Sequence, residues 1–479
     1  MNRIMIAATL LLLAGCGGDD DDLVVIPPNQ APQFTSAATA SLVENAALSY
    51  QATATDADGD ALSFSIAGGP DAARFSITPA GLLNFVEAPD ADRPADADGD
   101  NVYQVTLSVS DARTSVSLPL SITVTNSREG IAVRRVFSGF TRPVAMTAIP
   151  GDTRLFVGEA DGDIYYLDPA TGTRTFYARL PTRPGSFPSM NHITVSPDYA
   201  NDGLLYASDG VGTIFVSALV RANVEAGDPS NVVKVGEFTA GADFNPPRDA
   251  GWMGFGPDGN LYLTTGGNYE SQNFDQHDDN NFVGKLVRIH RDSAPGAAPQ
   301  FSYEVAAKGL FGANTATFSG NTLLIGDQGY IYTGEINRFD IDGPLISFGW
   351  PFFSGNNYLA GNAPAGLVAP TLAIPFSDPD EAKAGRFLVL GPIYNGPIAS
   401  LAGQLIFGAG ASGKIWTVDA SQLLGATGTL PLSAYALRSA DFTPDAGSIS
   451  GIQGFTATPD GKLYILDRDG EVFEVFAEA

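Results

Sequence analysis

The stretch TLLIGDQGYIYTGEINRFD, residues 322–340, consists of an apolar run, a turn rich in glycine and aspartate, and a second run that contains aromatic residues. Short apolar runs separated by such turns predict two β-strands joined as a hairpin. Five more segments follow the same pattern: 154–168, 204–219, 260–267, 404–419 and 462–476. Because these segments recur at roughly fifty to eighty residues, we expect one in each blade of a six-bladed β-propeller.

The length and composition of the chain limit its partners. A chain of 479 residues is long enough for two domains behind a targeting segment. Asp and Glu number 53 against 26 Lys and Arg, which gives a formal net charge of -27. We therefore expect no nucleic-acid partner and no binding to anionic lipid surfaces, whereas cations are favoured. The alternative is that the acidity only keeps an exported protein soluble.

The N-terminal sequence MNRIMIAATLLLLAGCGG has the features of an export signal. Arg3 precedes an apolar run, Ile4 to Leu13, that is too short to span a membrane. The sequence Leu-Ala-Gly-Cys ending at Cys16 resembles the lipobox of bacterial lipoproteins. The resemblance implies a signal peptide over residues 1–15, acylation of Cys16, and an acidic, proline-rich tether over 16–29. We expect a bacterial membrane-anchored lipoprotein of the outer membrane, periplasm or cell surface, held to the membrane through this anchor only.

Residues 30–127 form a unit of about a hundred residues, a usual size for a β-sandwich. The segments LSYQATATD at 48–56 and NVYQVTLSVSD at 101–111 alternate apolar and polar residues, as strands with one buried face do. The sequence DADGD occurs twice, at 56–60 and at 96–100. Carboxylates spaced two apart on a glycine-containing turn can converge on one calcium ion. Alternatively, DADGD is only a turn sequence, since Asp and Gly suit turns without metal.

The same segment is similar to cadherin-like domains in the sequences VEN, DADGDALSFSI, DRP and DNVYQVTLSVSD. The resemblance implies calcium ligands at the two ends of the sandwich: Glu44 and Asp92, and Asp56 and Asp58. The first pair would face the following domain and the second pair the tether. The family's linker motif Asp-x-Asn-Asp-Asn is replaced here by VTNSREG, with Asn126 and Glu129 as further candidate ligands, so both would be half-sites. The chain is thus predicted to be all-β, with a cadherin-like (Ig-like) β-sandwich followed by a six-bladed β-propeller.

Residues 130–479 resemble the soluble glucose and sorbosone dehydrogenases, which are six-bladed propellers that use pyrroloquinoline quinone (PQQ) and calcium. The resemblance rests on SPDYANDGLLYAS, GFGPDGNLYLTTGG and NFVGKLVRIHRD, and above all on the succession GDQG, GEIN and FGWP between residues 326 and 351. It implies a calcium site in which Glu335 supplies a carboxylate and Gly329, Tyr330 and Phe348 supply carbonyl oxygens.

This chain replaces residues on which the family's chemistry depends. A histidine of the family takes a proton from the sugar hydroxyl while a hydride leaves for the quinone. Alignment of the GPDG turn puts Arg248 at that position, and arginine stays protonated, so it cannot act as the base. The positions that hold the quinone carry Phe311, Gly312, Gly451 and Gln453, and the second-blade glutamine is replaced near Phe187. We expect PQQ to bind poorly, because a tricarboxylate needs cationic partners.

The replaced site retains residues that suit a ligand. Arg248, Asp249 and Trp252 are candidates to line the mouth of the central channel, where propellers bind small molecules. The alternative is that Trp252 packs between blades while Arg248 pairs with Asp249 or faces solvent.

A second polar region follows the third blade strand. Its residues Asp275, His277, Asp278 and Asp279 suit a transition metal or a proton relay, although most such runs are solvated loops. The two other histidines, His192 and His290, stand in strand-like segments and are expected to be structural.

Three functions remain open from the sequence. The leading hypothesis is a membrane-tethered extracytoplasmic protein that binds calcium and a saccharide or other small molecule, without the family's oxidation. The first alternative is an active PQQ-dependent sugar dehydrogenase that holds its quinone with other residues. The second is a non-enzymatic adhesion or scaffold protein in which the sandwich is the working part. The sequence therefore leaves open whether the chain is an enzyme.

Overall fold

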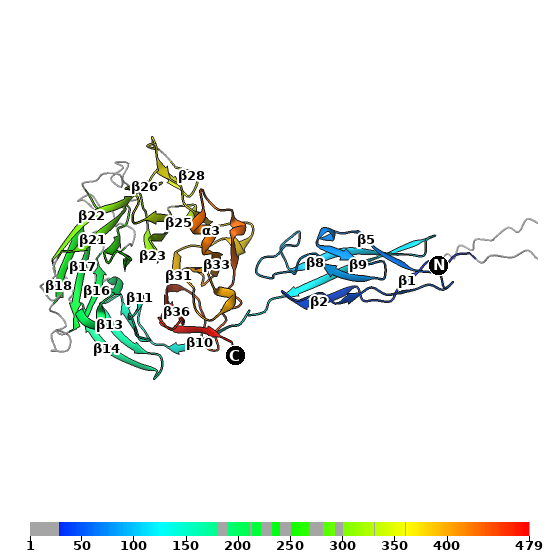
Figure 1. The fold of residues 1–479 in the computed structure, drawn as a ribbon, viewed down its shortest axis with the longest axis horizontal. Coiled ribbons are helices and arrows are strands. Elements are labelled where there is room, and N and C mark those ends of the chain that lie inside the picture. Colours follow the sequence, from blue (N-terminus) through cyan, green and yellow to red (C-terminus); the bar gives the residue numbers. More distant parts are fainter. Residues whose placement is uncertain are drawn as a thin grey trace, which may run out of the picture. The chain divides into compact units, whose positions relative to one another are not determined.

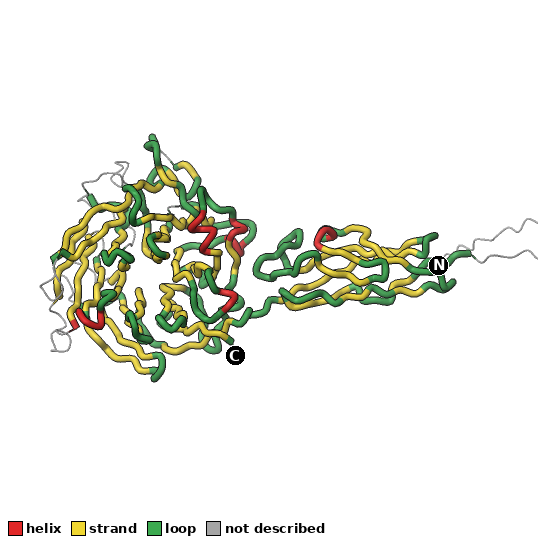
Figure 2. The backbone as a smooth tube through the Cα atoms, in the orientation of Figure 1, coloured by secondary structure: helices red, strands yellow, loops and turns green. Residues whose placement is uncertain are grey.

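The structure is a computed structural model that describes residues 28–180, 190–210, 213–221, 232–239, 251–267, 281–292, 300–329, 331–359 and 361–478. Its fold is nearly all-β, as predicted (Figures 1 and 2). Two compact units divide the chain. The first comprises Met1–Pro89 and Asp96–Val124, and the second comprises Asp90–Ala95 and Thr125–Ala479. The loop Asp90–Ala95 thus belongs to the second unit although the sequence around it belongs to the first.

The first unit consists of two packed sheets and a two-stranded sheet, β1-β4. Its strands are β1 (Gln33–Phe34), β2 (Thr39–Val43), β3 (Tyr50–Gln51), β4 (Ala54–Thr55), β5 (Ser63–Gly68), β6 (Phe75–Ile77), β7 (Leu82–Phe85), β8 (Val102–Ser110) and β9 (Ser115–Thr125). One sheet has the order β2-β9-β8-β5 and the other β3-β7-β6. Tyr103 of the first sheet packs edge-on against Phe75 and Phe85 of the second, at 6.2 and 4.9 Å between ring centroids. The two packed sheets agree with the predicted β-sandwich. Its resemblance to cadherin-like domains stays a prediction.

Among the described residues, the second unit contains six sheets that follow one another as blades, as predicted. Blade 1 consists of β11 (Pro143–Ala148), β12 (Leu155–Glu159), β13 (Asp163–Asp168) and β14 (Thr173–Arg179). Blade 2 consists of β15 (Met190–Val195), β16 (Leu204–Asp209), β17 (Thr213–Val220) and β18 (Val232–Thr239). Blade 3 consists of β19 (Met253–Phe255), β20 (Leu261–Thr264), β21 (Lys285–Arg291) and β22 (Phe301–Lys308), with β26 (Ile346–Phe348) and β29 (Leu367–Val368) at its edge. Blade 4 consists of β23 (Ala313–Ser319), β24 (Thr322–Asp327), β25 (Thr333–Asp340) and β30 (Leu372–Pro375). Blade 5 consists of β31 (Leu388–Ile393), β32 (Gln404–Ala409), β33 (Ile415–Asp419) and β34 (Tyr435–Leu437). Blade 6 consists of β35 (Ile452–Ala457), β36 (Leu463–Asp467), β37 (Val472–Ala477) and β10 (Ile131–Phe137).

The blades close into a ring. Each innermost strand contacts the innermost strands of the neighbouring blades, including the first and the last, β11 and β35. The last blade takes its outermost strand from the start of the unit, because β10 pairs antiparallel with β37. Arg134 of β10 donates both its Nε and its Nη2 to Glu474 of β37. Both ends of the propeller sequence therefore hold the ring shut.

Glycines allow adjacent blades to pack closely. A Cβ on Gly158 would stand 2.4 Å from the sulfur of Met190 in the next blade. A Cβ on Gly326 would stand 2.9 Å from Cγ of Leu390, again in the next blade. Since real Cβ atoms do not approach so closely, these positions of the hairpin phrases require glycine for packing between blades.

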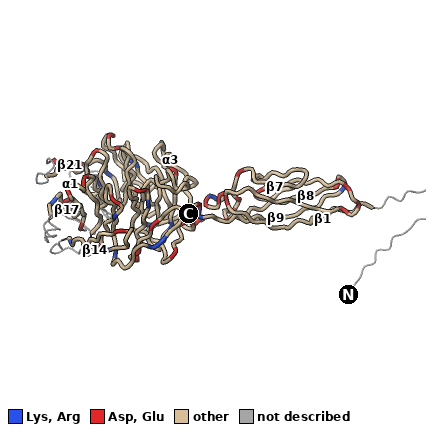
Figure 3. The backbone as a smooth tube through the Cα atoms, turned by 60° about the horizontal axis from the view of Figure 1, so that its bottom comes forward, with Lys and Arg blue, Asp and Glu red and all other residues tan. Residues whose placement is uncertain are grey.

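The described structure also contains several short elements. They are β27 (Phe353–Ser354), β28 (Asn357–Tyr358), the helices α1 (Tyr199–Asp202) and α3 (Ala420–Gly425), and the 3-10 turns η1 (Ala72–Arg74), η3 (Glu381–Lys383), η4 (Ala399–Leu401) and η5 (Leu432–Ala434). No helix in the described ranges has the length and apolar character needed to cross a membrane. Figure 3 shows acidic residues distributed along both units, with fewer basic residues among them.

Candidate functional site

Three residues predicted for the propeller site, Gly329, Glu335 and Trp252, lie at one end of the propeller. Because the strands of a blade are antiparallel, the connection from the second to the third strand lies at the same end as the chain entering the innermost strand. We call this end the entry face. Gly329 and Glu335 lie in or next to the connection from β24 to β25, and Trp252 directly precedes β19.

Several predicted residues fall outside the described part of the chain. They are Cys16, Phe187, Arg248, Asp249, Asp275, His277, Asp278, Asp279 and Tyr330. Their roles stay predictions from the sequence.

Buried carboxylates at the entry face hold the loops that lead into the blades. Glu159, Asp327 and Asp467 each end the second strand of a blade and are at most 3% exposed. Glu159 accepts a hydrogen bond from the backbone N–H of Thr141 at 2.6 Å. Asp327 accepts from the N–H groups of Phe311 and Gly312, and Asp467 from those of Ser450 and Gly451, at 2.7–2.9 Å. The loops carrying positions 311, 312 and 451 are therefore ordered by carboxylates.

The Asp467 contacts give a first prediction. We expect Asp467→Asn to lower the free energy of unfolding by about 1–3 kcal/mol, because hydrogen bonds to a buried charge are weakened. The matched control is Asp469→Asn on the same connection. Partial desolvation and the neighbouring Asp467 raise the pKa of Asp469 to about 6. The charged form of Asp469 is therefore disfavoured in the folded protein, and removing its charge should leave stability unchanged or slightly higher. Equal unfolding midpoints for both variants in urea would contradict the role of Asp467.

Asp327 and Glu335 form a buried pair of acids. They face each other in register across β24 and β25 and are 2% and 8% exposed. Glu335 accepts hydrogen bonds from the N–H of Gly355 and, at 3.2 Å, from the Asn337 amide. Burial, with the charge of Asp327, raises the pKa of Glu335 to about 7, and burial also raises the pKa of Asp327. Among the described residues, no Lys or Arg forms an ion pair with either acid.

Further oxygen atoms near this pair lack hydrogen-bond partners. Thr333 Oγ1, Asn337 Oδ1 and Ser354 Oγ are buried and unpaired within the described structure. Gly329 brings its backbone close to them, since a Cβ there would stand 3.2 Å from Ser354 Oγ. Buried polar atoms normally find a partner, and calcium takes six to eight oxygen ligands that include carboxylates. We call Asp327, Thr333, Glu335, Asn337 and Ser354 the Glu335 pocket. The oxygen donors that they offer are of the kinds that calcium takes.

The predicted carbonyl ligand Phe348 is fully buried at the end of β26. Its carbonyl oxygen faces Gly309, where a Cβ would stand 2.5 Å away. The structure thus places Gly329 beside the Glu335 pocket and Phe348 against Gly309.

The residues that the sequence analysis aligns with the family's quinone-holding positions carry no charged side chain. Phe311 is 1% exposed and packs on Trp350, with ring centroids 4.3 Å apart. Gly312 lies against the side chain of Gln328. Beside Gly451 is Arg468, whose Nη2 donates to the carbonyl of Gly410 at 2.8 Å. These residues do not fit a tricarboxylate in the family's manner, because no guanidinium stands at the replaced positions.

Trp252 and His192 share one enclosed space at the boundary of blades 2 and 3. Their ring centroids are 6.3 Å apart, and Trp252 is 7% exposed in a cluster with Tyr262 and Leu323. This burial matches the packing alternative for Trp252. Desolvation lowers the pKa of His192 to about 4, so its ring is neutral at pH 7. His290 Nδ1 is 2.9 Å from the amide oxygen of Asn260, in keeping with a structural histidine.

The two DADGD sequences place their carboxylates together. Oxygen atoms of Asp56, Asp58 and Asp60 lie within 4.8 Å of one another, and so do those of the second group, 96–100. In the first group, Asp58 accepts from the N–H of Gln30 at 2.7 Å, and Asp60 pairs with Arg113 at 3.4 Å. Glu44 is 3% exposed. Calcium binding at these residues stays a prediction.

Asp92 lies beside a cation that the sequence analysis missed. Arg438, which is 6% exposed, forms ion pairs with Asp92 at 2.8 Å and with Glu129 and Asp441. Asn126 donates to the other oxygen of Asp92 at 2.9 Å. We call Asp92, Glu129, Asp441 and Arg438 the Arg438 cluster. The candidate calcium ligands Asp92 and Glu129 therefore already have a guanidinium partner, and ALRSAD, the sequence around Arg438, contains no motif that would have indicated it.

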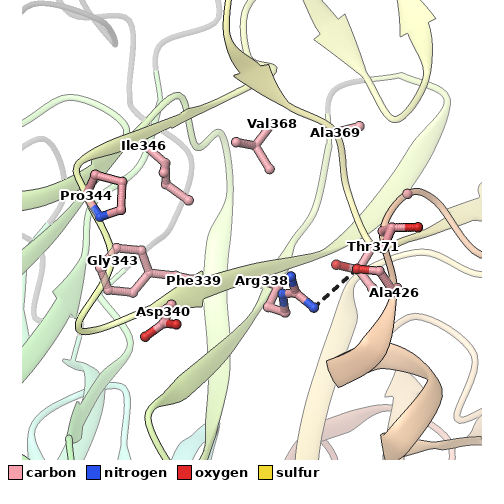
Figure 4. A pocket seen from close by; sticks show the side chains of 12 residues that line it. Arg338, Phe339, Asp340, Gly343, Pro344, Ile346, Val368, Ala369, Thr371 and Ala426 are labelled. Atoms are coloured by element: carbon pink, nitrogen blue, oxygen red, sulfur yellow. Dashed lines mark hydrogen bonds between the residues drawn. The ribbon is translucent and has the colours of Figure 1, made fainter.

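A cavity of about 330 Å³ lies at the opposite end of β25 from Glu335. Its walls include Arg338, Ile346, Val368 and Thr371 (Figure 4). Arg338 Nη1 donates to the carbonyl of Ala426 at 3.2 Å, the contact drawn in Figure 4, and to that of Leu424. This guanidinium therefore joins blade 4 to the segment after α3, and the cavity is separate from the Glu335 pocket.

The ring of six blades defines a six-bladed β-propeller. A model of the glucose/sorbosone dehydrogenase family matches residues 140–473, so the chain belongs to this family. No curated protein sequence matches the chain.

Solved structures share the fold. The PQQ-bound aldose sugar dehydrogenase of Streptomyces coelicolor is 20% identical, with a TM-score of 0.53, covering 72% of this chain and 98% of that one. The soluble aldose sugar dehydrogenase of Escherichia coli is 17% identical, with a TM-score of 0.51, covering 72% and 99%. A Trichoderma reesei protein of carbohydrate-active enzymes family AA12 is 15% identical, with a TM-score of 0.50, covering 73% and 96%.

Proposed function

We propose that the propeller binds calcium in the Glu335 pocket and a saccharide or similar small molecule at the entry face, without quinone-dependent oxidation. The observation that supports this is a contrast between two parts of one face. The acids and unpaired oxygens of the Glu335 pocket suit a divalent cation, whereas Phe311, Gly312 and Gly451 offer no charge to a quinone.

The residues of the pocket would act through charge and position. Asp327 and Glu335 would hold the ion, which supplies positive charge and coordination positions for ligand hydroxyl groups. Asp327 also keeps the N–H groups of Phe311 and Gly312 fixed, so the loop they form would keep one conformation whether or not a ligand is bound. A neutral polyhydroxylated molecule suits this face better than a tricarboxylate, because it needs no cationic partners.

The sequence supports an extracytoplasmic location for this activity. The lipobox-like sequence before Cys16 favours a lipid anchor, and the acidic and proline-rich residues after it favour a tether. In this proposal the propeller samples small molecules outside the cytoplasm while the anchor keeps it at a membrane.

The second prediction tests the absence of oxidation. Purified protein with added PQQ and calcium should reduce no artificial electron acceptor with a panel of aldoses. Arg248→His should not create activity either, because positions 311, 451 and 453 still lack the quinone's partners. The same substitution should weaken a bound sugar acid, since it removes a guanidinium. Sugar-dependent turnover by either protein would show that the quinone site is intact and would refute the proposal.

A further inference from the structure

A second concave site lies between blades 1 and 2, away from the entry face. It is a groove of about 620 Å³. Its lining comes from the connection between β11 and β12, from β13 and β14, and from α1, which lies between β15 and β16. The connections between first and second strands are at the opposite end of the blades from Glu335. We call it the tyrosine groove after Tyr166, Tyr177 and Tyr199, which line it.

The three tyrosine rings are held in place from behind. Phe156 is fully buried and its ring packs against all three, at centroid distances of 5.4, 4.9 and 5.9 Å. The hydroxyl groups of Tyr177 and Tyr199 are 3.3 Å apart. Burial raises the pKa of Tyr166, so its hydroxyl stays protonated and able to donate. Tyr199 is only 6% exposed, so the groove presents the partly exposed rings of Tyr166 and Tyr177 and the ring of Phe176, which is 53% exposed.

Two arginines lie flat over these rings. The guanidinium carbon of Arg154 is 4.9 Å from the centroid of Tyr166, and that of Arg221 is 5.3 Å from the centroid of Tyr199. Arg154 also binds both oxygens of Asp152 at 2.8–2.9 Å. Arg221 donates to the carbonyl of Ala200 at 3.1 Å. The stacked geometry and these contacts preorganise donors and acceptors along the walls.

The chemistry of the walls selects the class of ligand. A purely apolar ligand would strip water from Asp152, Arg154 and the phenols without replacing their hydrogen bonds, which is costly. An anion is disfavoured because Asp152 already compensates Arg154 and the chain carries a net charge of -27. A pyranose ring has C–H faces that pack on aromatic surface and hydroxyl groups that pair with carboxylate, guanidinium and phenol groups.

We infer that the tyrosine groove is a binding site for a neutral oligosaccharide, separate from the ligand site of the entry face. The groove volume falls in the range of small-molecule sites. Adjacent hydroxyl groups of a sugar would bind the Asp152 and Arg154 pair, and the sugar ring would pack on Phe176 and Tyr177, since the arginines already cover Tyr166 and Tyr199. The protein would then hold a glycan at its side independently of the Glu335 pocket.

The experiment is calorimetric titration of the purified protein with cellohexaose, maltohexaose and laminarihexaose. Thr175 is exposed on β14 and pairs with Tyr166, so Thr175→Trp should place an indole in the groove. We expect at least one hexasaccharide to bind and this variant to weaken it at least tenfold. Tyr303→Trp is the matched control on the outer strand of blade 3, where Tyr303 is 47% exposed, and should change affinity less than twofold.

Two further variants make the test decisive. Arg154→Ala removes a half-exposed side chain and should weaken binding at least fivefold even if Thr175→Trp does not fold. Glu335→Gln alters the proposed entry-face site, so hexasaccharide binding that persists in this variant and is lost in the groove variants belongs to the groove. The inference is overturned if no hexasaccharide binds at 10 mM, if the groove variants bind as the parent does, or if Glu335→Gln alone abolishes binding.

Discussion

Replacing Arg438 by methionine should lower the free energy of unfolding of the propeller by about 3–5 kcal/mol. The Arg438 cluster is nearly solvent-free, since Arg438 is 6% and Asp441 0% exposed. Methionine keeps most of the side-chain volume but removes the only cation that ion-pairs with Asp441 among the described residues. The fully buried carboxylate of Asp441 would then lose its counter-ion, and this costs more than the loss of the ion pair itself. Denaturant unfolding, followed at the propeller transition, measures the change.

The control is Arg135→Met. Arg135 pairs with Glu471, but its side chain is 38% exposed, so we expect a loss of about 1 kcal/mol or less. Calcium provides a second measurement, because oxygen atoms of Asp92, Glu129 and Asp441 lie within 4.8 Å of one another and could bind a cation together. If the guanidinium occupies the place of a cation, millimolar calcium should restore part of the stability of Arg438→Met. A variant as stable as the parent in chelator would show that the cluster contributes nothing.

The sequence predicted the propeller because its strands repeat. Each blade carries the same hairpin phrase, and apolar alternation with glycine turns is a local signal that survives wide divergence. The closing strand β10 lacks this signal, since its partner β37 lies over 300 residues away in the chain. Pairing at such distance depends on the finished ring, so the sequence predicted a propeller without indicating which strand closes it.

The candidate site was only partly predictable for a similar reason. Glu335 was predicted through the resemblance, and its register with Asp327 follows from the hairpin. Thr333 and Ser354 come from different segments, and their unpaired oxygens become apparent only when the fold brings them together. Arg438 was missed because a single arginine is not a recognisable sequence motif. Its role depends on carboxylates that lie 309 and 3 residues away in the chain. Turns and repeats can be recognised from short stretches of sequence, whereas the pairing of buried charges depends on the tertiary structure.

Without calcium, the stability of the propeller should fall by about 3 kcal/mol as pH rises from 4.5 to 7, through Glu335 alone. Its pKa in the folded protein is about 7, above the ordinary value of 4.5. Between these values the folded state binds more protons than the unfolded state, so raising pH favours unfolding. Above pH 7 the loss from Glu335 is complete. The raised pKa of Asp327 acts in the same direction.

Calcium should remove this loss, because it binds the ionised acids of the folded state. At one hundred times its dissociation constant, an ion specific to the folded state adds about 2.7 kcal/mol. Unfolding in urea at pH 5 and pH 8, in chelator and in calcium, therefore gives four values with a defined order. The lowered pKa of His192 raises stability over the same pH range, so the loss from Glu335 is measured as the difference between the parent and Glu335→Gln, in which His192 is unchanged. Relative to that variant, the chelated parent should lose stability from pH 5 to pH 8, and calcium should raise its stability mainly at pH 8.

Glu335→Gln separates this pocket from every other acid in the chain. The amide keeps the size of the side chain but does not ionise, so the variant should lose the fall in stability that Glu335 causes as pH rises, and most of the calcium effect. Glu304→Gln is the matched control, since Glu304 is 54% exposed on β22 and should leave both effects unchanged. If Glu335→Gln retains the calcium effect at pH 8, the ion binds elsewhere, with the DADGD sequences as the next candidates. If the parent and Glu335→Gln change in stability by the same amount between pH 5 and pH 8 in chelator, the acid pair is not buried in the way that raises its pKa, and calcium binding in the Glu335 pocket loses its physical basis.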